Sequence, residues 1–409
     1  HMILEFSINN FYSFKEENAV SFVVNKKSPC TDSYFTTENG KRVTKILACY
    51  GPNASGKTNL LKSLSFLRWF ICKSFDHLKP DSKIPIQPFL FEKDKTDVTS
   101  LSVVFEFSGK IYRYSLDLTP TQVVNESLYI RDGRGFKYLF KREWNENEKK
   151  FDFSTKNFGL TPSFGINLDK RKNASLLSIS LQHNNENSKA ITAYWAKLAT
   201  NVQEHGRAAR LDRNGMFTRI FDTAEYFFEH KENKTKAETF LKHFDLGLSG
   251  IKIEERELGI DKEGKPEKII VPFGVHLGKD KSTYDLSFHY ESSGTQNLFV
   301  LLRQILPILA EGGIAVLDEF EIDLHPHMVP ALLELFTSPK NNPHNAQLLF
   351  SCHSIELMKK LDKYQVLLVE KDEYGYSHVI RLDEIKGVRS DDNIYAKYDS
   401  GAYGAVPNI

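Results

Sequence analysis

The 409-residue sequence contains little cysteine and almost no net charge. Its four cysteines, Cys30, Cys49, Cys72 and Cys352, form no C-x-x-C pair, which argues against a zinc ribbon or a disulfide scaffold. Lys and Arg total 54 against 53 for Asp and Glu, so the overall charge does not indicate a nucleic-acid or anionic-membrane partner. Any such contact would depend on a local basic surface.

Long apolar segments are also lacking. The longest, residues 298–310, is interrupted by Arg303 and Pro307 and is too short to span a bilayer. The apolar run near Met2 soon gives way to polar residues, so no signal peptide is predicted and a reducing cytoplasm is the expected location. What is present is typical of a globular protein, with 41% hydrophobic, 26% charged and 12% aromatic residues.

Hydrophobic periodicity divides the chain into β-rich and helical parts. Several strand-like runs between about residues 99 and 153 predict an antiparallel meander. Helical spacing without sustained heptads follows, so a compact helical insertion is expected in place of a coiled-coil arm. We therefore expect an N-terminal lobe at 2–165, a helical insertion at 166–248 and a C-terminal lobe at 249–409.

A phosphate-binding loop is the clearest chemical motif. A predicted strand ends at Tyr50 and a predicted helix follows the loop, as the P-loop mechanism requires. The pattern G-x-x-x-x-G-K-[ST] is matched by Gly51, Pro52, Asn53, Ala54, Ser55, Gly56, Lys57 and Thr58. We expect Lys57 to bind the β- and γ-phosphates of ATP and Thr58 to hold Mg²⁺. The nucleotide-binding residues predicted from this segment are Asn53, Ala54, Ser55, Gly56, Lys57, Thr58 and Asn59.

A pair of acids follows a second buried strand. The apolar residues 314–317 lead directly into Asp318 and Glu319. Ligands of α/β proteins bind outside the carboxyl ends of the strands, so these acids are expected near the phosphate loop. Asp318 is predicted to orient Mg²⁺, and Glu319 to act as the general base for the attacking water. A paired acid favours the ABC and SMC-like branch of P-loop proteins over small GTPases.

Three weaker segments extend this interpretation. Residues 291–296 (ESSGTQ) are similar to the ABC signature L-S-G-G-Q, so Ser293 and Gly294 are expected to bind an anion at a helix N-terminus; a simple Ser N-cap is the alternative. His353 follows a strand and is predicted to contact the γ-phosphate. Gln87 is predicted to be a Q-loop glutamine that links Mg²⁺ to the variable region.

Together these motifs resemble the ABC-type ATPases of the overcoming-lysogenization-defect and AAA15/RloA-like group, relatives of Rad50 and SMC heads used in bacterial anti-phage systems. The resemblance covers most of the chain and rests on ILEFSINNFYSF, GPNASGKTNLLKSL, ESSGTQ, VLDEFEIDLHPHM, SCHS and the tail YDSGAYGAVP. It implies an α/β fold, an ABC/SMC-like P-loop ATPase head with an antiparallel β subdomain and a helical insertion. It also implies an ATP sandwich in which Ser293 and Gly294 complete the Lys57 site of a second copy, with Asp323 as the D-loop acid.

The chain departs from the family pattern in two places. Many relatives carry Arg or Lys where Tyr12 stands, and Lys15 is a candidate substitute. The chain after Ile380 is also too short for the TOPRIM domain of the nuclease members. The run His325-Pro326-His327 near the acids could suggest a transition-metal site, although a run of this kind is normal in the family.

The resemblance implies a Mg²⁺-dependent ATPase, with ATP and Mg²⁺ as cofactors, whose dimer closure controls a separate effector. The expected partners are a second copy of the chain and a nuclease or toxin from a neighbouring gene, with no membrane partner. A Rad50-type DNA-binding ATPase in repair or chromosome maintenance is the alternative. It would need a basic surface, for which residues 170–172 and the lysines between 231 and 242 are candidates. A transporter subunit is disfavoured by the long insertions.

Overall fold

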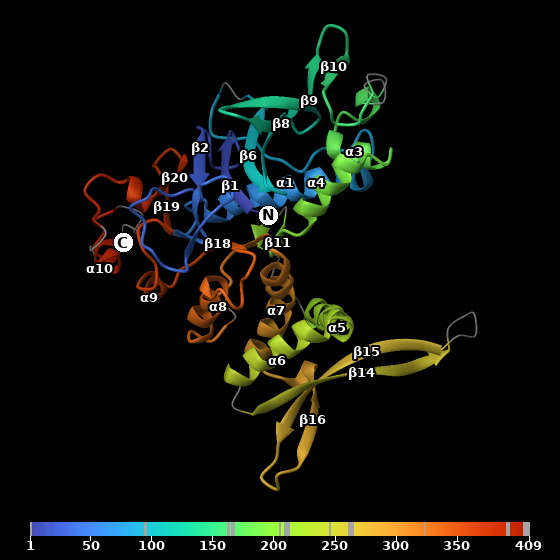
Figure 1. The fold of residues 1–409 in the computed structure, drawn as a ribbon, viewed down its shortest axis with the longest axis vertical. Helices are drawn as coiled ribbons and strands as arrows, with labels where there is room; N and C mark the ends of the chain where they lie inside the picture. The colour runs from blue at the N-terminus through green and yellow to red at the C-terminus, as the bar shows by residue number, and fades with distance from the viewer. Residues whose placement is uncertain are drawn as a thin grey trace.

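The chain folds into an elongated molecule with one β-sheet at each end and a third sheet between them (Figure 1). The computed structural model describes residues 2–93, 96–161, 164, 168–203, 206–207, 213–244, 247–260, 266–322, 324–389 and 393–403. Among the helices in these ranges, none combines the length and apolar character needed to cross a membrane.

An antiparallel seven-stranded sheet forms the upper layer in Figure 1. In sheet order its strands are β10 (Lys150–Thr155), β9 (Gly135–Asn145), β8 (Val123–Asp132), β7 (Lys110–Leu118), β6 (Thr99–Phe107), β1 (Met2–Asn9) and β2 (Asn18–Ser21). The run from β6 to β10 is the predicted antiparallel meander, which is confirmed. In β6 alternate side chains are buried, because only one face of this sheet is covered.

The middle layer is a six-stranded, mostly parallel sheet. In sheet order its strands are β11 (Ala199–Thr200), β17 (Ile314–Leu317), β18 (Gln347–Ser351), β5 (Ile46–Tyr50), β19 (Val366–Lys371) and β20 (Ser377–Arg381). All except β20 run parallel to their neighbours. Strands β17, β18 and β5 are buried throughout, as expected for a sheet covered on both faces. Because these strands are parallel, the residues that follow each of them meet at one edge.

The first hydrophobic core lies between these two sheets. Its central element is α1 (Lys57–His77), flanked by α3 (Leu176–Leu181) and α4 (Glu186–Ala196). Leu47 and Cys49 of β5 face this core, whereas Ile46, Ala48 and Tyr50 face the opposite side. Successive side chains of this buried strand therefore point alternately into the two hydrophobic cores of the molecule.

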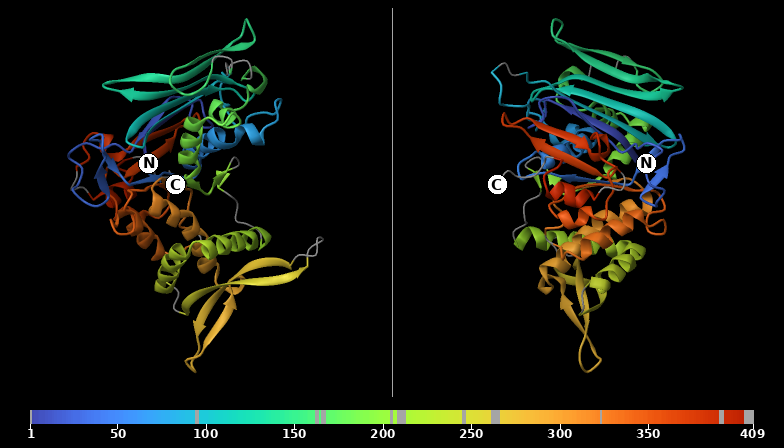
Figure 2. Two further views of the ribbon diagram at one scale, coloured as in Figure 1. Left: turned by 45° about the vertical axis from the view of Figure 1, so that its right-hand side comes forward. Right: turned by 90° about the vertical axis from the view of Figure 1, so that its left-hand side faces the viewer.

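The second core covers the other face of the middle sheet and continues into the lower half of the molecule (Figure 2). Its helices are α5 (Arg213–Glu229), α6 (Lys231–Phe244), α7 (Ser293–Glu311), α8 (Met328–Thr337), α9 (Ile355–Met358) and α10 (Ile394–Asp399). A three-stranded sheet of β14 (Leu248–Ile260), β15 (Pro266–Leu277) and β16 (Thr283–Ser287) closes the lower end. The short elements are β3 (Tyr34–Thr36), β4 (Arg42–Thr44), β12 (Val202–Gln203), β13 (Gly206–Arg207), η2 (Asp169–Arg171), η3 (Phe288–Tyr290) and η4 (Leu382–Glu384).

The expected helical insertion, 166–248, is helical over much of its described length but is divided between the two cores. Helices α3 and α4 pack with α1, and β11 joins the middle sheet beside β17. Helices α5 and α6 instead pack on α7 in the second core. Helical periodicity shows which residues are buried but not which partner buries them, and a two-residue strand leaves no periodic pattern.

A buried ion pair fixes the upper sheet to the helices beside α1. Glu126 on β8 is fully buried and pairs with Arg142 on β9, whose Nε donates to it at 2.8 Å. The same carboxylate accepts hydrogen bonds from the hydroxyls of Tyr114 and Ser175 and from the backbone N–H of Leu176 at the start of α3. Because the donors come from β7, β9 and the start of α3, this one side chain sets how the sheet and α3 meet.

Replacing Glu126 with Ala should therefore destabilise the fold strongly. Arg142 would remain buried without its counter-charge, and breaking such a pair costs about 3–5 kcal/mol of unfolding free energy. Urea unfolding measures the loss. Glu143→Ala, on the exposed face of β9, is the control and should change stability by less than about 0.5 kcal/mol. Similar small losses in both variants would show that the pair does not anchor the sheet.

Candidate functional site

The loop between β5 and α1 contains backbone conformations with positive φ, which glycine adopts more readily than other residues. Gly51 and Gly56 have φ values of 157° and 114°, and Ala54 between them has φ of 62°. A Cβ on Gly51 would lie 2.1 Å from the carbonyl oxygen of Val369 in β19, and one on Gly56 would lie 2.5 Å from Ser377 Oγ. The two glycines are therefore required by close approach of β19 and β20 to the loop.

The Lys57 ammonium lies inside this loop. It is buried and donates hydrogen bonds to the carbonyl oxygens of Gly51 at 2.7 Å and Pro52 at 2.9 Å. Burial lowers the pKa of Lys57, while the nearby Asp318 and Glu319 act in the opposite direction. A cation held by neutral carbonyls in a loop with a helix N-terminus behind it is suited to an incoming phosphate.

Asp318 connects three elements at the carboxyl edge of the middle sheet. Its carboxylate accepts hydrogen bonds from Thr58 Oγ1 of α1 at 2.7 Å and from Ser351 Oγ of β18 at 2.5 Å. Ser351 Oγ in turn accepts the backbone N–H of Glu319 at 2.8 Å. A hydroxyl and a carboxylate oxygen side by side fit Mg²⁺, which takes few protein ligands and keeps several waters. Among the described residues, no cluster of three or more His, Cys, Asp or Glu side chains is arranged to hold a metal.

Glu319 and His353 form a second pair at the same edge. His353 Nε2 lies 2.7 Å from Glu319 Oε1, and both side chains are about one-third exposed, at 35% and 31%. Glu319 has φ of 47°, a conformation that a non-glycine residue adopts only when its surroundings enforce it. The backbone N–H of His353 donates to Glu321 at 2.6 Å, which fixes the loop that carries the imidazole. A carboxylate and an imidazole so placed can exchange a proton with a water molecule between them and the phosphate loop.

Comparison with known proteins agrees with this geometry. A family model described as "AAA domain, putative AbiEii toxin, Type IV TA system" matches residues 46–359, from β5 to the end of α9. The chain belongs to this AAA family. The AAA15/RloA-like ABC-type interpretation of the motifs is thereby confirmed, as is the α/β P-loop head with its antiparallel β subdomain. Among curated proteins, none matches this chain.

Solved SMC head domains are among the structures similar to this chain. The SMC head domain from Thermotoga maritima has a TM-score of 0.43 and 13% identity, covering 93% of this chain and 99% of that chain. An SMC head bound to the C-winged helix domain of ScpA has a TM-score of 0.48 and 12% identity, covering 93% and 97%. A Pyrococcus furiosus SMC head bound to the C-terminal domain of ScpA has a TM-score of 0.45 and 11% identity, covering 92% and 95%.

Asn201 is a residue of this AAA site that the sequence did not indicate. It follows β11, and its side chain accepts the backbone N–H of Asp318 at 2.7 Å and donates to the carbonyl oxygen of Asp318 at 2.9 Å. This double hydrogen bond fixes the backbone of Asp318, the residue expected to orient Mg²⁺. The only signal available in the sequence was a polar residue after a short apolar stretch, and β11 is too short for periodicity to detect.

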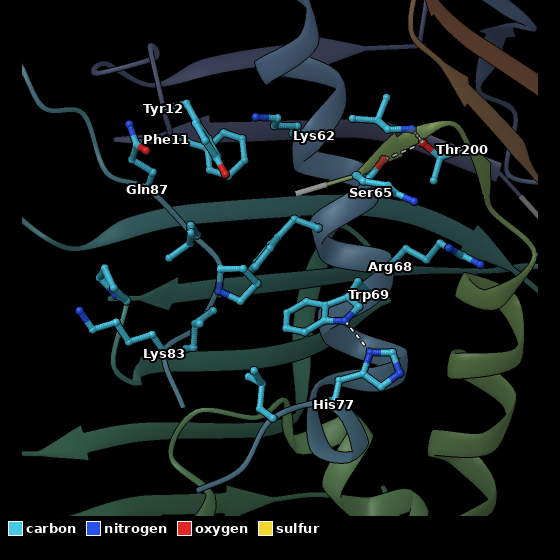
Figure 3. Close-up of a pocket in the computed structure, with 18 residues that line it drawn as sticks. Phe11, Tyr12, Lys62, Ser65, Arg68, Trp69, His77, Lys83, Gln87 and Thr200 are labelled. Atoms are coloured by element: carbon cyan, nitrogen blue, oxygen red, sulfur yellow. Dashed lines mark hydrogen bonds between the residues drawn. The ribbon is translucent and has the colours of Figure 1, made fainter. Parts of the chain in front are cut away.

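Two residues predicted to bind nucleotide or metal, Asn59 and Gln87, make their contacts outside the group formed by Lys57, Thr58, Asp318 and Glu319. The Asn59 amide donates to Ser13 Oγ at 2.9 Å, which joins α1 to the turn after β1. Gln87 is exposed and lies on the wall of a cavity beside Tyr12 (Figure 3), and that wall includes neither Thr58 nor Asp318. Among the described residues, no hydrogen bond joins the Gln87 side chain to Thr58 or Asp318.

The signature residues begin α7, far from Lys57 of the same chain. Ser292 is the N-cap and accepts the Thr295 backbone N–H at 3.1 Å, so Ser293 is left exposed on the first turn. The Gln296 amide donates to three backbone carbonyl oxygens of the preceding segment and stabilises this helix start. Figures 1 and 2 place the start of α7 by β16 in the lower half, whereas α1 lies in the upper half.

Three parts of the predicted site complete the comparison. Asn53, Ala54 and Ser55 form the loop around Lys57, as expected from their position. Asp323 lies outside the described residues, so the predicted D-loop contact stays a prediction. The last residues of the tail motif, 404–407, also lie outside the described part of the chain.

Gly51→Ala should damage this site through the backbone alone. The added Cβ would overlap the Val369 carbonyl, so we expect a loss of about 2 kcal/mol or more of unfolding free energy, or a displaced loop. Thermal unfolding and ATP titration measure the two effects. Gly135→Ala is the control, because a Cβ there meets nothing within 4 Å. Unchanged melting and unchanged ATP affinity in Gly51→Ala would contradict the described loop geometry.

Proposed function

We propose that this AAA-family chain is a Mg²⁺-dependent ATPase whose ATP-driven dimer closure and hydrolysis regulate a separate effector, a nuclease or toxin, in bacterial anti-phage defence. The observation that supports it most is the hydrogen-bonded series from Thr58 through Asp318 and Ser351 to Glu319. This series joins Asp318 and Glu319, the acids proposed to hold the metal and to accept the proton, at the edge of the sheet where Lys57 lies. The family description associates this kind of domain with a toxin–antitoxin system.

Each residue at this edge has a distinct proposed role. Lys57 binds the β- and γ-phosphates, and Thr58 and Asp318 hold Mg²⁺, which would offset phosphate charge when bound. Glu319 accepts the proton of the attacking water, and His353 orients that carboxylate from 2.7 Å away. Gln87 stays a proposed metal contact that would require movement of the segment that carries it.

A second copy of the chain is proposed to complete the site. Ser293 and Gly294 lie at the exposed start of α7, so they can reach Lys57 only in another copy. Tyr290, three residues earlier, is 79% exposed, an unusual state for a large aromatic side chain. Closure of two copies around ATP would cover both features together.

The basic segments that a DNA-binding alternative would need are engaged within the chain. Arg171 donates to the backbone carbonyls of Phe75 and Leu78, and its guanidinium lies over the Phe75 ring. Lysines of α6 pair with acids on the same helix, at Lys234–Glu238, Lys236–Glu232 and Lys242–Glu238. These contacts favour a solvated helix face over a DNA contact, so we retain the effector function as the proposal.

Glu319→Gln should bind ATP but hydrolyse it about 10²–10⁴-fold more slowly, because the amide cannot accept the proton. Single-turnover hydrolysis measures the rate, and light scattering measures accumulation of closed dimers. Glu334→Gln on the exposed face of α8 is the control with the same charge change. Turnover near that of the unaltered protein would remove Glu319 as the base.

The same variant tests the effector. Glu319→Gln is expressed from its native operon and captured in the presence of ATP and Mg²⁺. The proteins that co-purify with it are identified by mass spectrometry. We expect a stoichiometric neighbour with nuclease or toxin character. Recovery of DNA alone, released by salt, would instead favour the repair-type alternative.

Ser293→Arg should block closure and abolish turnover if the site is shared between copies. The decisive measurement mixes this variant with Lys57→Ala, which lacks the phosphate-binding lysine. In a mixed pair, Lys57 of the first chain meets Ser293 of the second, so partial ATPase activity should return. No recovery in any mixing ratio, with both variants folded, would argue against a composite site.

A further inference from the structure

A cavity of about 1050 Å³ lies beside α1, outside the site of Lys57 and Asp318 (Figure 3). One wall is the outer face of α1, a second is the segment from His77 to Gln87 together with Tyr12, and a third is β11 with β12. Small-molecule sites are typically about 300–1,000 Å³, so there is room for a ligand much larger than water or a metal ion.

Positive charge lines this cavity. Lys62 and Arg68 come from α1, Lys83 comes from the loop that follows it, and the lining, all within the described ranges, includes no Asp or Glu. Arg68 Nε is buried without a hydrogen-bond partner among the described residues. Because the lining holds cations and no opposing carboxylate, its potential favours an anion.

Aromatic rings lie between these cations. The Trp69 indole N–H donates to His77 Nδ1 at 3.1 Å, so the neutral imidazole carries its proton on Nε2 and can donate there. The Lys62 ammonium lies 4.2 Å from the centroid of the Tyr12 ring. Ring faces beside cations suit a ligand that carries both a flat ring and a phosphate.

The walls of the cavity are connected to the nucleotide site. Helix α1 begins with Lys57 and Thr58, and Ser65 further along it is hydrogen-bonded to Thr200 of β11 at 2.8 Å. Thr200 precedes Asn201, whose side chain holds the backbone of Asp318. A ligand in contact with Ser65 and Thr200 therefore acts one residue away from the support of the metal acid.

We infer that this cavity is a regulatory site for a nucleotide, which binds through its phosphate and its base. Occupancy of the cavity alters ATP turnover through Thr200 and Asn201. The phosphate contacts Lys83 and the base stacks on Trp69, while Lys62 and Arg68 add positive charge from α1 (Figure 3). A free mononucleotide and the 5′ end of a single strand both present this chemistry. The effect on turnover rests on the proposed ATPase function, whereas binding does not.

Binding is measured in Lys57→Ala, so that the phosphate loop does not contribute. The probes are AMP, inorganic phosphate and 5′-phosphorylated hexathymidylate, followed by calorimetry and by quenching of Trp69 fluorescence. We expect saturable binding that Lys83→Glu weakens by about tenfold or more. Lys79→Glu is the matched control, because Lys79 is exposed in the same loop and is outside the lining; it should change affinity by less than about threefold.

The outcomes separate the two sources of the ligand. Binding of AMP supports a free nucleotide, and binding of the oligonucleotide without AMP supports a strand end. Binding of inorganic phosphate as tight as that of either nucleotide overturns the nucleobase assignment, and so does the absence of any binding. Equal weakening by Lys79→Glu and Lys83→Glu overturns the cavity as the site. If Lys57→Ala fails to fold, the titration uses Lys57→Met, which keeps the length of the side chain but lacks its ammonium, and binding must persist there.

Coupling is measured on the otherwise unaltered protein. The probe that binds should change ATP turnover, with the change lost in Lys83→Glu and kept in Lys79→Glu. An ATP turnover rate that is the same with and without the bound probe overturns the regulatory role. Absence of any ATPase activity would instead refute the proposed function and the coupling that rests on it, while the binding result in Lys57→Ala would stand.

Discussion

The carboxylate of Asp318 is the point at which the helix and strands of the nucleotide site are held together. It accepts from Thr58 at the start of α1 and from Ser351 at the end of β18, while Asn201 after β11 holds its backbone. A buried carboxylate is stable only when such donors surround it. Any movement of α1 relative to the strands is therefore transmitted to this one residue, which is also the expected metal acid.

This arrangement depends on the middle sheet being parallel and covered on both faces. Because β11, β17, β18 and β5 run in one direction, the polar residues after them gather at one edge although they are distant in sequence. The two cores on either side of the sheet then separate two tasks. The core around α1 supports the phosphate loop. The core around α7 holds the helix whose first residue, Ser293, lies in the lower half of the molecule (Figure 1).

Left-handed backbone conformations also occur at this edge. The left-handed conformations of Ala54 and Glu319 and the close approach of Gly51 to β19 occur where phosphate, metal and water chemistry is expected. The lining of the cavity beside α1 includes none of these residues, and its connection to the edge runs through Thr200, which precedes Asn201.

Local motifs in the sequence were sufficient to predict the phosphate loop, the acids after β17, His353 after β18 and the antiparallel meander. Each depends on neighbours within a few residues, a strand next to a glycine loop or an apolar run next to two acids, and such patterns survive in sequence. The division of 166–248 between two cores, the two hydrogen bonds from Asn201 to the Asp318 backbone and the position of Gln87 on the wall of a cavity were decided only by the tertiary structure. They depend on which strand lies beside which, and β11 is a two-residue strand whose position is fixed by pairing with β17, a contact between residues more than a hundred positions apart.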